Sequence, residues 1–199
     1  NLNIEDVDAV VFPGGFGAAK NLSSFAHSAE PSVDGEVARV IRECLEAAKP
    51  MALCCIAPIL LALVLCKEDG KNIKLTLGQR TGEGWPYAAT IDKAKEFGAD
   101  VVEMTVDEVC VDEANKIVTT PAYMFDGSYF EIHEGVVKMI EAGLALLLRI
   151  LTFEIEKKSH TLRTAWYTFT DIYYNLMILR RISSISSIHV FYQKGHQPI

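Results

Sequence analysis

A chain of 199 residues in which 50% are hydrophobic is long enough for one domain with a sizeable core. The net charge of −7 argues against a nucleic-acid partner, because binding to the phosphate backbone depends on a surplus of basic side chains. No stretch resembles a secretory signal, since the first residues hold neither a basic segment nor an apolar run.

The five cysteines are odd in number, and none belongs to a Cys-x-x-Cys pair. We therefore expect reduced thiols in an intracellular compartment and no metal site, and no motif indicates a cofactor. The longest apolar run, residues 51–66, is shorter than the roughly twenty residues that a bilayer needs, and Pro58 interrupts it. A buried strand and helix are expected there, rather than a membrane span.

The first predicted strand spans residues 7–12, because a short β-branched and apolar run is typical of a strand buried on both faces. It runs into the glycine-rich segment 13–20, whose spacing differs from the dinucleotide fingerprint and from the Walker loop. We expect a turn whose backbone N–H groups point at a neighbouring site. An amphipathic helix is predicted to start at Asp34 and to end before Lys49-Pro50.

The stretch Met51-Ala-Leu-Cys-Cys-Ile-Ala-Pro58 predicts a buried strand, a tight turn and the start of a buried helix. The turn places Cys55 at the carboxyl end of the strand, near free helix N–H groups that stabilise a thiolate. The N–H of Ile56 and one from Gly14 or Gly15 are expected to form an oxyanion hole. Cys54 is interpreted as a core residue, and the alternative is that both cysteines are small core residues.

The second half of the domain continues the alternation of strands and helices. Trp85 and Tyr87, in the loop 79–89, either wall a pocket or plug the loop onto the domain. The alternation indicates an α/β sandwich around a mostly parallel sheet, whose ligands bind beyond the carboxyl ends of the strands. Strands are expected at 74–78, 99–103, 109–111 and 116–120, and helices at 91–97, with Thr90 as N-cap, and from Ser128 onward.

The last part of the chain differs from the rest. It has no glycine between Leu151 and Gly195, its periodicity is weak, and residues 183–188 are of low complexity. An alternative exon, a read-through intron or a gene-prediction error would produce such a sequence, and a small helical extension is the competing interpretation. We therefore divide the chain into a domain at 1–148 and a tail of unknown structure at 149–199.

Four motifs along the chain are shared, in the same order, with a known family: Pro13–Leu22, Leu53–Pro58, Trp85–Ala88 and Asn115–Met124. Together they resemble the ElbB-like branch of the ThiJ/PfpI superfamily, and most closely its eukaryotic mitochondrial members with a class I glutamine amidotransferase-like domain. The resemblance covers about Glu5 to Leu148 and implies a flavodoxin-like three-layer sandwich. Members of this family begin with a strand and an acidic residue that lies against the cysteine of the turn after the later strand. The resemblance therefore implies that this chain lacks that first strand.

The resemblance implies that Cys55, the cysteine of the Cys-x-x-Pro motif, is the nucleophile of a glutathione-independent glyoxalase or deglycase. On that interpretation Cys55 adds to a small dicarbonyl as a hemithioacetal, while the N–H groups of Gly14, Gly15 and Ile56 hold the developing oxyanion. PfpI-like peptidases have histidine at the position of Ile56, so neither peptidase nor amidotransferase activity is expected.

The expected partner is a small reactive aldehyde or another metabolite, and a homodimer is a further option. The family implies a mitochondrial location. Two alternatives to the enzyme stay open. One is a non-catalytic thiol protein in which Cys55 senses oxidation or the pocket binds a metabolite. The other is a truncated chain without activity.

Overall fold

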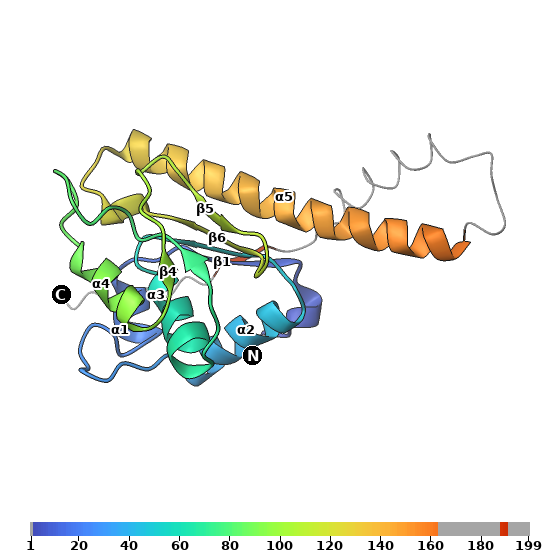
Figure 1. Cartoon of the computed structure of the whole chain (residues 1–199), viewed down its shortest axis with the longest axis horizontal. Coiled ribbons are helices and arrows are strands. Elements are labelled where there is room, and N and C mark those ends of the chain that lie inside the picture. The colour runs from blue at the N-terminus through green and yellow to red at the C-terminus, as the bar shows by residue number, and fades with distance from the viewer. Residues whose placement is uncertain (1, 163–187, 191–199) are drawn as a thin grey trace, which may run out of the picture.

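A five-stranded sheet in the order β5-β6-β2-β1-β7 forms the centre of the domain (Figure 1). The computed structural model describes residues 2–162 and 188–190, with side chains for residues 2–153. The strands of this sheet are β1 (Ala9–Phe12), β2 (Met51–Cys54), β5 (Cys110–Asp112), β6 (Ile117–Thr120) and β7 (Ile188–Val190). The helices are η1 (Ile4–Asp6), α1 (Phe16–Asn21), α2 (Gly35–Glu46), α3 (Pro58–Leu61), the π-helix η2 (Ala62–Glu68), α4 (Ala89–Glu96), η3 (Ala122–Met124) and α5 (Tyr129–Leu162).

The pairing of the strands is mostly parallel. β1 pairs in parallel with β2 on one side and with β7 on the other, and β2 pairs in parallel with β6. β5 forms an antiparallel hairpin with β6. The predicted α/β class with a mostly parallel sheet is therefore confirmed. On the edge of β1 that faces away from β2, the sheet continues with β7.

A short ladder of β3 (Lys74–Leu75) and β4 (Asp100–Val101) is attached to the main sheet through side chains. The carboxylate of Asp112 accepts the N–H of Lys74 at 2.8 Å, and the hydroxyl of Thr119 accepts the N–H of Thr76 at 2.9 Å. These buried acceptors replace the backbone carbonyls of a neighbouring strand. The strands expected at 74–78 and 99–103 are therefore shorter than predicted.

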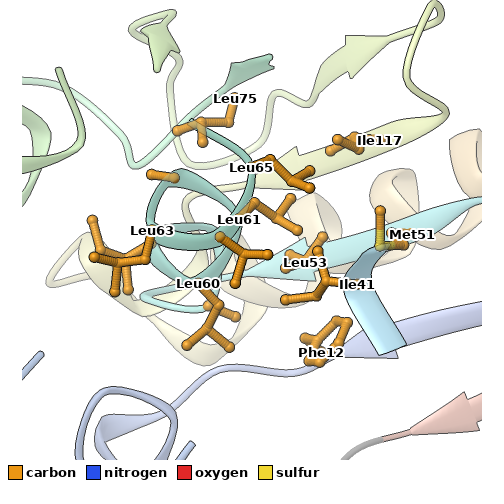
Figure 2. Packing of buried hydrophobic residues seen from close by; sticks show 14 of the residues in the cluster. Phe12, Ile41, Met51, Leu53, Leu60, Leu61, Leu63, Leu65, Leu75 and Ile117 are labelled. Atoms are coloured by element: carbon orange, nitrogen blue, oxygen red, sulfur yellow. The ribbon is translucent and has the colours of Figure 1, made fainter. Parts of the chain in front are cut away.

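One face of the sheet is covered by the continuous segment of α3 and η2, together with α2. Every side chain from Ala57 to Leu65 is buried, as expected for a helix that is apolar all round. In Figure 2, Leu61 of this segment lies on the side of the helix that faces Leu53 of β2, whereas Leu63 points to the opposite side. The buried strand and helix that the apolar run predicts are both present.

α5 covers the opposite face of the sheet (Figure 1). Its buried hydrophobic side chains are Ile132, Met139, Leu146 and Leu147, and the first three recur every seven positions. The hydroxyl and N–H of Ser128 both donate to the carboxylate of Glu131, which forms a capping arrangement at the predicted helix start. α5 continues without a break through residue 148, where a domain boundary was expected, and most of the tail, including the low-complexity run 183–187, lies outside the described residues.

Helix starts and ends follow local hydrogen bonds, and one of them differs from the prediction. Asp34 caps α2, since its carboxylate accepts the N–H groups of Glu36 and Val37. α4 begins at Ala89, before the expected N-cap Thr90. The N–H of Thr90 already donates to the carbonyl oxygen of Tyr87, so Thr90 lies inside the first turn of α4. Within the described residues, no helix is long and apolar enough to cross a membrane.

Candidate active site

Cys55 occupies the turn between β2 and α3 with a left-handed backbone, at a φ of +60°. A non-glycine residue in this region carries a strain of about 1–3 kcal/mol that the surrounding structure must hold. The N–H of Cys55 donates to the carbonyl oxygen of Thr120 at 3.2 Å, and the N–H of Ala57 donates to the carbonyl oxygen of Cys54 at 3.1 Å. Pro58 starts α3 directly afterwards. The ends of β2 and β6 therefore fix the cysteine at the carboxyl edge of the sheet.

Gly14 lies directly against this elbow. Its φ is +80°, and a Cβ atom added there would lie 2.4 Å from the carbonyl oxygen of Cys54 and 2.8 Å from the Cβ of Cys55. This close approach requires glycine. Gly15 has a φ of +82° and open space where its Cβ would be. The structure thus brings together the glycine turn and the elbow, which the sequence predicts as separate features.

Backbone N–H groups around the elbow are available to a ligand. Those of Gly14, Gly15 and Ile56 have no hydrogen-bond acceptor among the described residues. Gly15 and Ile56 also line the same cavity as Cys55. An oxyanion formed next to the thiol would therefore find donors that have no competing protein partner.

The two adjacent cysteines differ in environment. Cys54 is 6% exposed, its thiol donates to the carbonyl of Pro13 at 3.0 Å, and burial raises its pKa to about 12. Cys55 is half-buried and lines the cavity. Burial likewise raises the pKa of the remaining three thiols, those of Cys44, Cys66 and Cys110. Of the five cysteines, Cys55 is the one with access to a ligand.

A cavity of about 340 Å³ opens beside Cys55. Its lining contains no acidic, basic or histidine side chain. The rings of Phe16, Tyr87 and Tyr123 remain largely exposed around it, at 72%, 54% and 53%. The lining consists of Gly15, Phe16, Ala19, Phe25, Ala26, Cys55, Ile56, Tyr87, Thr90, Tyr123 and Met124.

The structure separates the two aromatic residues of the loop 79–89. Tyr87 lines the cavity, whereas Trp85 does not. A Cβ atom on Gly78 would lie 2.1 Å from the Cζ3 of Trp85, and the ring centroids of Trp85 and Phe125 are 4.9 Å apart. Of the two interpretations of this loop, the contacts of Trp85 agree with the plug rather than with a wall of this cavity, because Gly78 leaves room for the indole.

Sequence reasoning missed the exposed aromatic residues of the lining that lie outside that loop, Phe16 and Tyr123. Both follow the carboxyl end of a strand, β1 in the first case and β6 in the second. The rule that ligands bind at this edge of a parallel sheet was therefore the signal that could have found them. Among the described residues, no cluster of His, Cys, Asp and Glu side chains could hold a metal ion.

The comparison with solved structures agrees with this architecture. The crystal structure of an isoprenoid biosynthesis protein with an amidotransferase-like domain from Ehrlichia chaffeensis aligns with a TM-score of 0.63 and 26% identity. The alignment covers 73% of this chain and 62% of that one. No protein-family model matches the chain. The fold and this structural similarity support a class I glutamine amidotransferase-like protein.

The sequence comparisons narrow this class. The chain is 45% identical over 149 residues to the human glutamine amidotransferase-like class 1 domain-containing protein 3, mitochondrial, and 45% identical over 148 residues to the ES1 protein homolog, mitochondrial, of Rattus norvegicus. Each alignment covers 73% of this chain and 54% of the relative. The ES1 protein, mitochondrial, of Danio rerio is 32% identical over 148 residues, covering 70% of the chain and 53% of the relative. These mitochondrial proteins are thus homologues of this chain, which spans about half of their length.

Proposed function

We propose that this chain is a glutathione-independent glyoxalase of the amidotransferase-like class, which converts small dicarbonyls into hydroxy acids through Cys55. One observation carries the proposal. The thiol of Cys55 reaches a cavity, while its backbone is held in a strained turn beside N–H groups without a protein acceptor. A reactive cysteine next to oxyanion donors suits addition to an aldehyde.

The reaction would proceed in three balanced steps. The thiolate of Cys55 adds to the aldehyde carbon and forms a hemithioacetal, whose oxyanion accepts hydrogen bonds from Gly15 and Ile56. A proton then moves from this carbon to the neighbouring carbonyl carbon, which leaves a thioester of the hydroxy acid. Water hydrolyses the thioester, releases the acid and restores the thiol.

The proton transfer needs an acid–base group, and the lining of the cavity limits the choice. It contains no carboxylate and no imidazole. Besides Cys55, its titratable side chains are those of Tyr87 and Tyr123. These two phenols are therefore the groups on this chain to which the proposal assigns the proton transfer.

The test compares the two adjacent cysteines in the same chain. We expect Cys55→Ser to abolish consumption of methylglyoxal and formation of lactate, whereas Cys54→Ser keeps both, because the buried Cys54 does not reach the cavity. Intact folding of both variants is checked by circular dichroism. Equal loss in the two variants, or turnover without Cys55, would contradict the proposal.

A second candidate function is a thiol sensor without turnover. The absence of a carboxylate or imidazole from the cavity lining favours it, since oxidation of a thiol needs no proton carrier positioned for a substrate carbon. Mild peroxide would then convert Cys55 to the sulfinic acid, and no dicarbonyl would be consumed. Peptide mass spectrometry and the methylglyoxal assay on one sample distinguish the two functions.

The names of the relatives support a particular location of the protein in the cell. All three relatives are mitochondrial by name. The proposal therefore includes a mitochondrial location for this protein, which fractionation and imaging of the protein in its own cells would test.

A further inference from the structure

We propose that the cavity beside Cys55 selects carbonyl compounds that carry an aromatic ring, such as aryl-substituted glyoxals, over glyoxal and methylglyoxal. That the ligand carries a carbonyl group rests on the proposed function. The preference for a ring rests on the walls of the cavity alone.

The first argument is charge. Since the lining has no charged side chain, phosphate and carboxylate groups on a ligand would be desolvated there without a counter-charge. A second cavity of about 360 Å³ shares Phe25 with this one, and its own charged side chains are already paired: Lys67 with Glu30 at 3.1 Å, and Lys93 with Glu96 at 2.7 Å. Charged metabolites are therefore poor occupants of the cavity at Cys55.

The second argument is the exposed rings. Phe16, Tyr87 and Tyr123 come from three separate parts of the chain, the start of α1, the loop before α4 and η3. Each is more than half exposed, and none of them stacks on another ring among the described residues. Aromatic faces that converge on one cavity without a partner are suited to a planar apolar group.

The third argument is the backbone that presents Tyr123. The preceding residue, Ala122, is buried and has a left-handed φ of +45°. The carbonyl of Thr120, at the end of β6, accepts the N–H of Cys55, so this segment and the elbow are directly joined. Two strained residues on neighbouring strand ends therefore hold a thiol and a ring at one cavity, and such strain is concentrated at ligand sites.

The fourth argument is size. A volume of about 340 Å³ is at the lower end of the range for ligand pockets, and it exceeds by far the ~30 Å³ share of one water molecule. A dicarbonyl of a few heavy atoms, such as glyoxal or methylglyoxal, would leave most of this space to water against apolar walls. A phenyl-substituted glyoxal places its aldehyde at the thiol and its ring among the aromatic side chains.

The experiment measures selectivity at Cys55 without relying on turnover. The rates at which N-phenylmaleimide and N-methylmaleimide label Cys55 are followed by peptide mass spectrometry, and their ratio is divided by the ratio for a small free thiol. We expect a preference for the phenyl reagent of about tenfold or more in the wild-type chain. Tyr123→Ala should remove most of it, and Tyr123→Phe should retain it, since the ring is preserved.

A matched control is available on α5. Phe153 is 68% exposed, comparable to Phe16, and it does not line the cavity. Phe153→Ala should leave the preference unchanged, whereas Phe16→Ala should lower it. A ratio equal to that of the free thiol, or equal loss in Phe153→Ala, would overturn the inference.

Steady-state kinetics separate this inference from the proposed function. A higher kcat/KM for phenylglyoxal than for methylglyoxal, with the ratio of the two values lowered by Phe16→Ala, supports both. A labelling preference without turnover of any dicarbonyl refutes the glyoxalase and supports the aromatic ligand. Turnover that is faster with methylglyoxal, together with unselective labelling, supports the glyoxalase and overturns the inference.

Discussion

The two faces of the central sheet are covered by helices of different kinds. On one face, α3 and η2 form a segment whose residues from Ala57 to Leu65 are all buried (Figure 2). On the other face, which α5 covers (Figure 1), the helix buries a narrow stripe, and side chains such as Phe130 and Val137 are exposed. The elbow of Cys55 leads directly into the fully buried segment, and its side chain packs against the cores of both faces.

This difference explains where a strained residue can persist. The left-handed backbone of Cys55 costs free energy, so packing on both sides must hold it. The α3 segment provides that packing, because a turn anchored to a helix without an exposed face has little freedom to relax. α5 encloses Cys54 on the other side and keeps that thiol out of contact with ligands.

The largest expected effect concerns Cys54 and Cys55, which differ in burial and in access to the cavity. At pH 8, iodoacetamide should label Cys55 on the order of a hundredfold faster than Cys54. Burial raises the pKa of Cys54 to about 12, so its thiol stays protonated as well as inaccessible from pH 7 to pH 9. Time-resolved peptide mass spectrometry measures both rates in one sample, and similar rates in the folded chain would contradict this difference.

The next effect compares the cores of the two faces. Leu61→Ala, at a side chain with 0% exposure, should lower the free energy of unfolding by about 3–5 kcal/mol. Leu146→Ala, at a 4% exposed position on α5, should lower it by about 2–3 kcal/mol, because the edge of this stripe can partly close over the gap. Urea unfolding gives both values, and an equal or reversed order would show that the faces do not differ in this way.

A smaller loss is expected from Gly135→Ala on α5. Its added Cβ atom would lie 2.2 Å from the carbonyl oxygen of Val106 and 3.1 Å from the hydroxyl of Thr120. Since the closest atom is backbone, the helix or the loop must shift, at a cost of about 1–3 kcal/mol. Thermal unfolding measures the change, and an increase in Tm would mean that the loop at Val106 yields more easily than the structure indicates.

The features that the sequence predicts correctly are those that depend on neighbours along the chain. Asp34 caps its own helix, the run after Cys55 is apolar at every turn, and Ser128 with Glu131 starts α5. The strand-end rule also led to Cys55 and the glycine turn, since a strand followed by Gly-Gly or by Cys-x-x-Pro is a local pattern. For these elements, the local propensities and the tertiary packing agree.

What the sequence does not reveal depends on contacts between distant segments. Trp85 and Tyr87 are two positions apart, and their different roles follow from space left by Gly78 and from the ring of Phe125. The pairing of β7 with β1 joins opposite ends of the chain, and no periodicity in the last fifty residues indicates it. Tyr123 lines the same cavity as Cys55 because β6 is the neighbour of β2, which is a property of the sheet order.

The smallest expected effect is a gain in stability from Gly143→Ala, two helical turns beyond Gly135 on the same helix. The added Cβ atom would lie 3.7 Å from the Cβ of Ala52, an ordinary van der Waals contact, and a small void of about 20 Å³ adjoins this position. Alanine is favoured over glycine in a helix by about 0.5–1 kcal/mol, so the free energy of unfolding should rise by that amount. Urea unfolding of Gly135→Ala and Gly143→Ala side by side sharpens the comparison, because the substitution is identical and the neighbours alone set the sign. A loss of stability in Gly143→Ala would show that α5 lies closer to β2 at Ala52 than the structure has it.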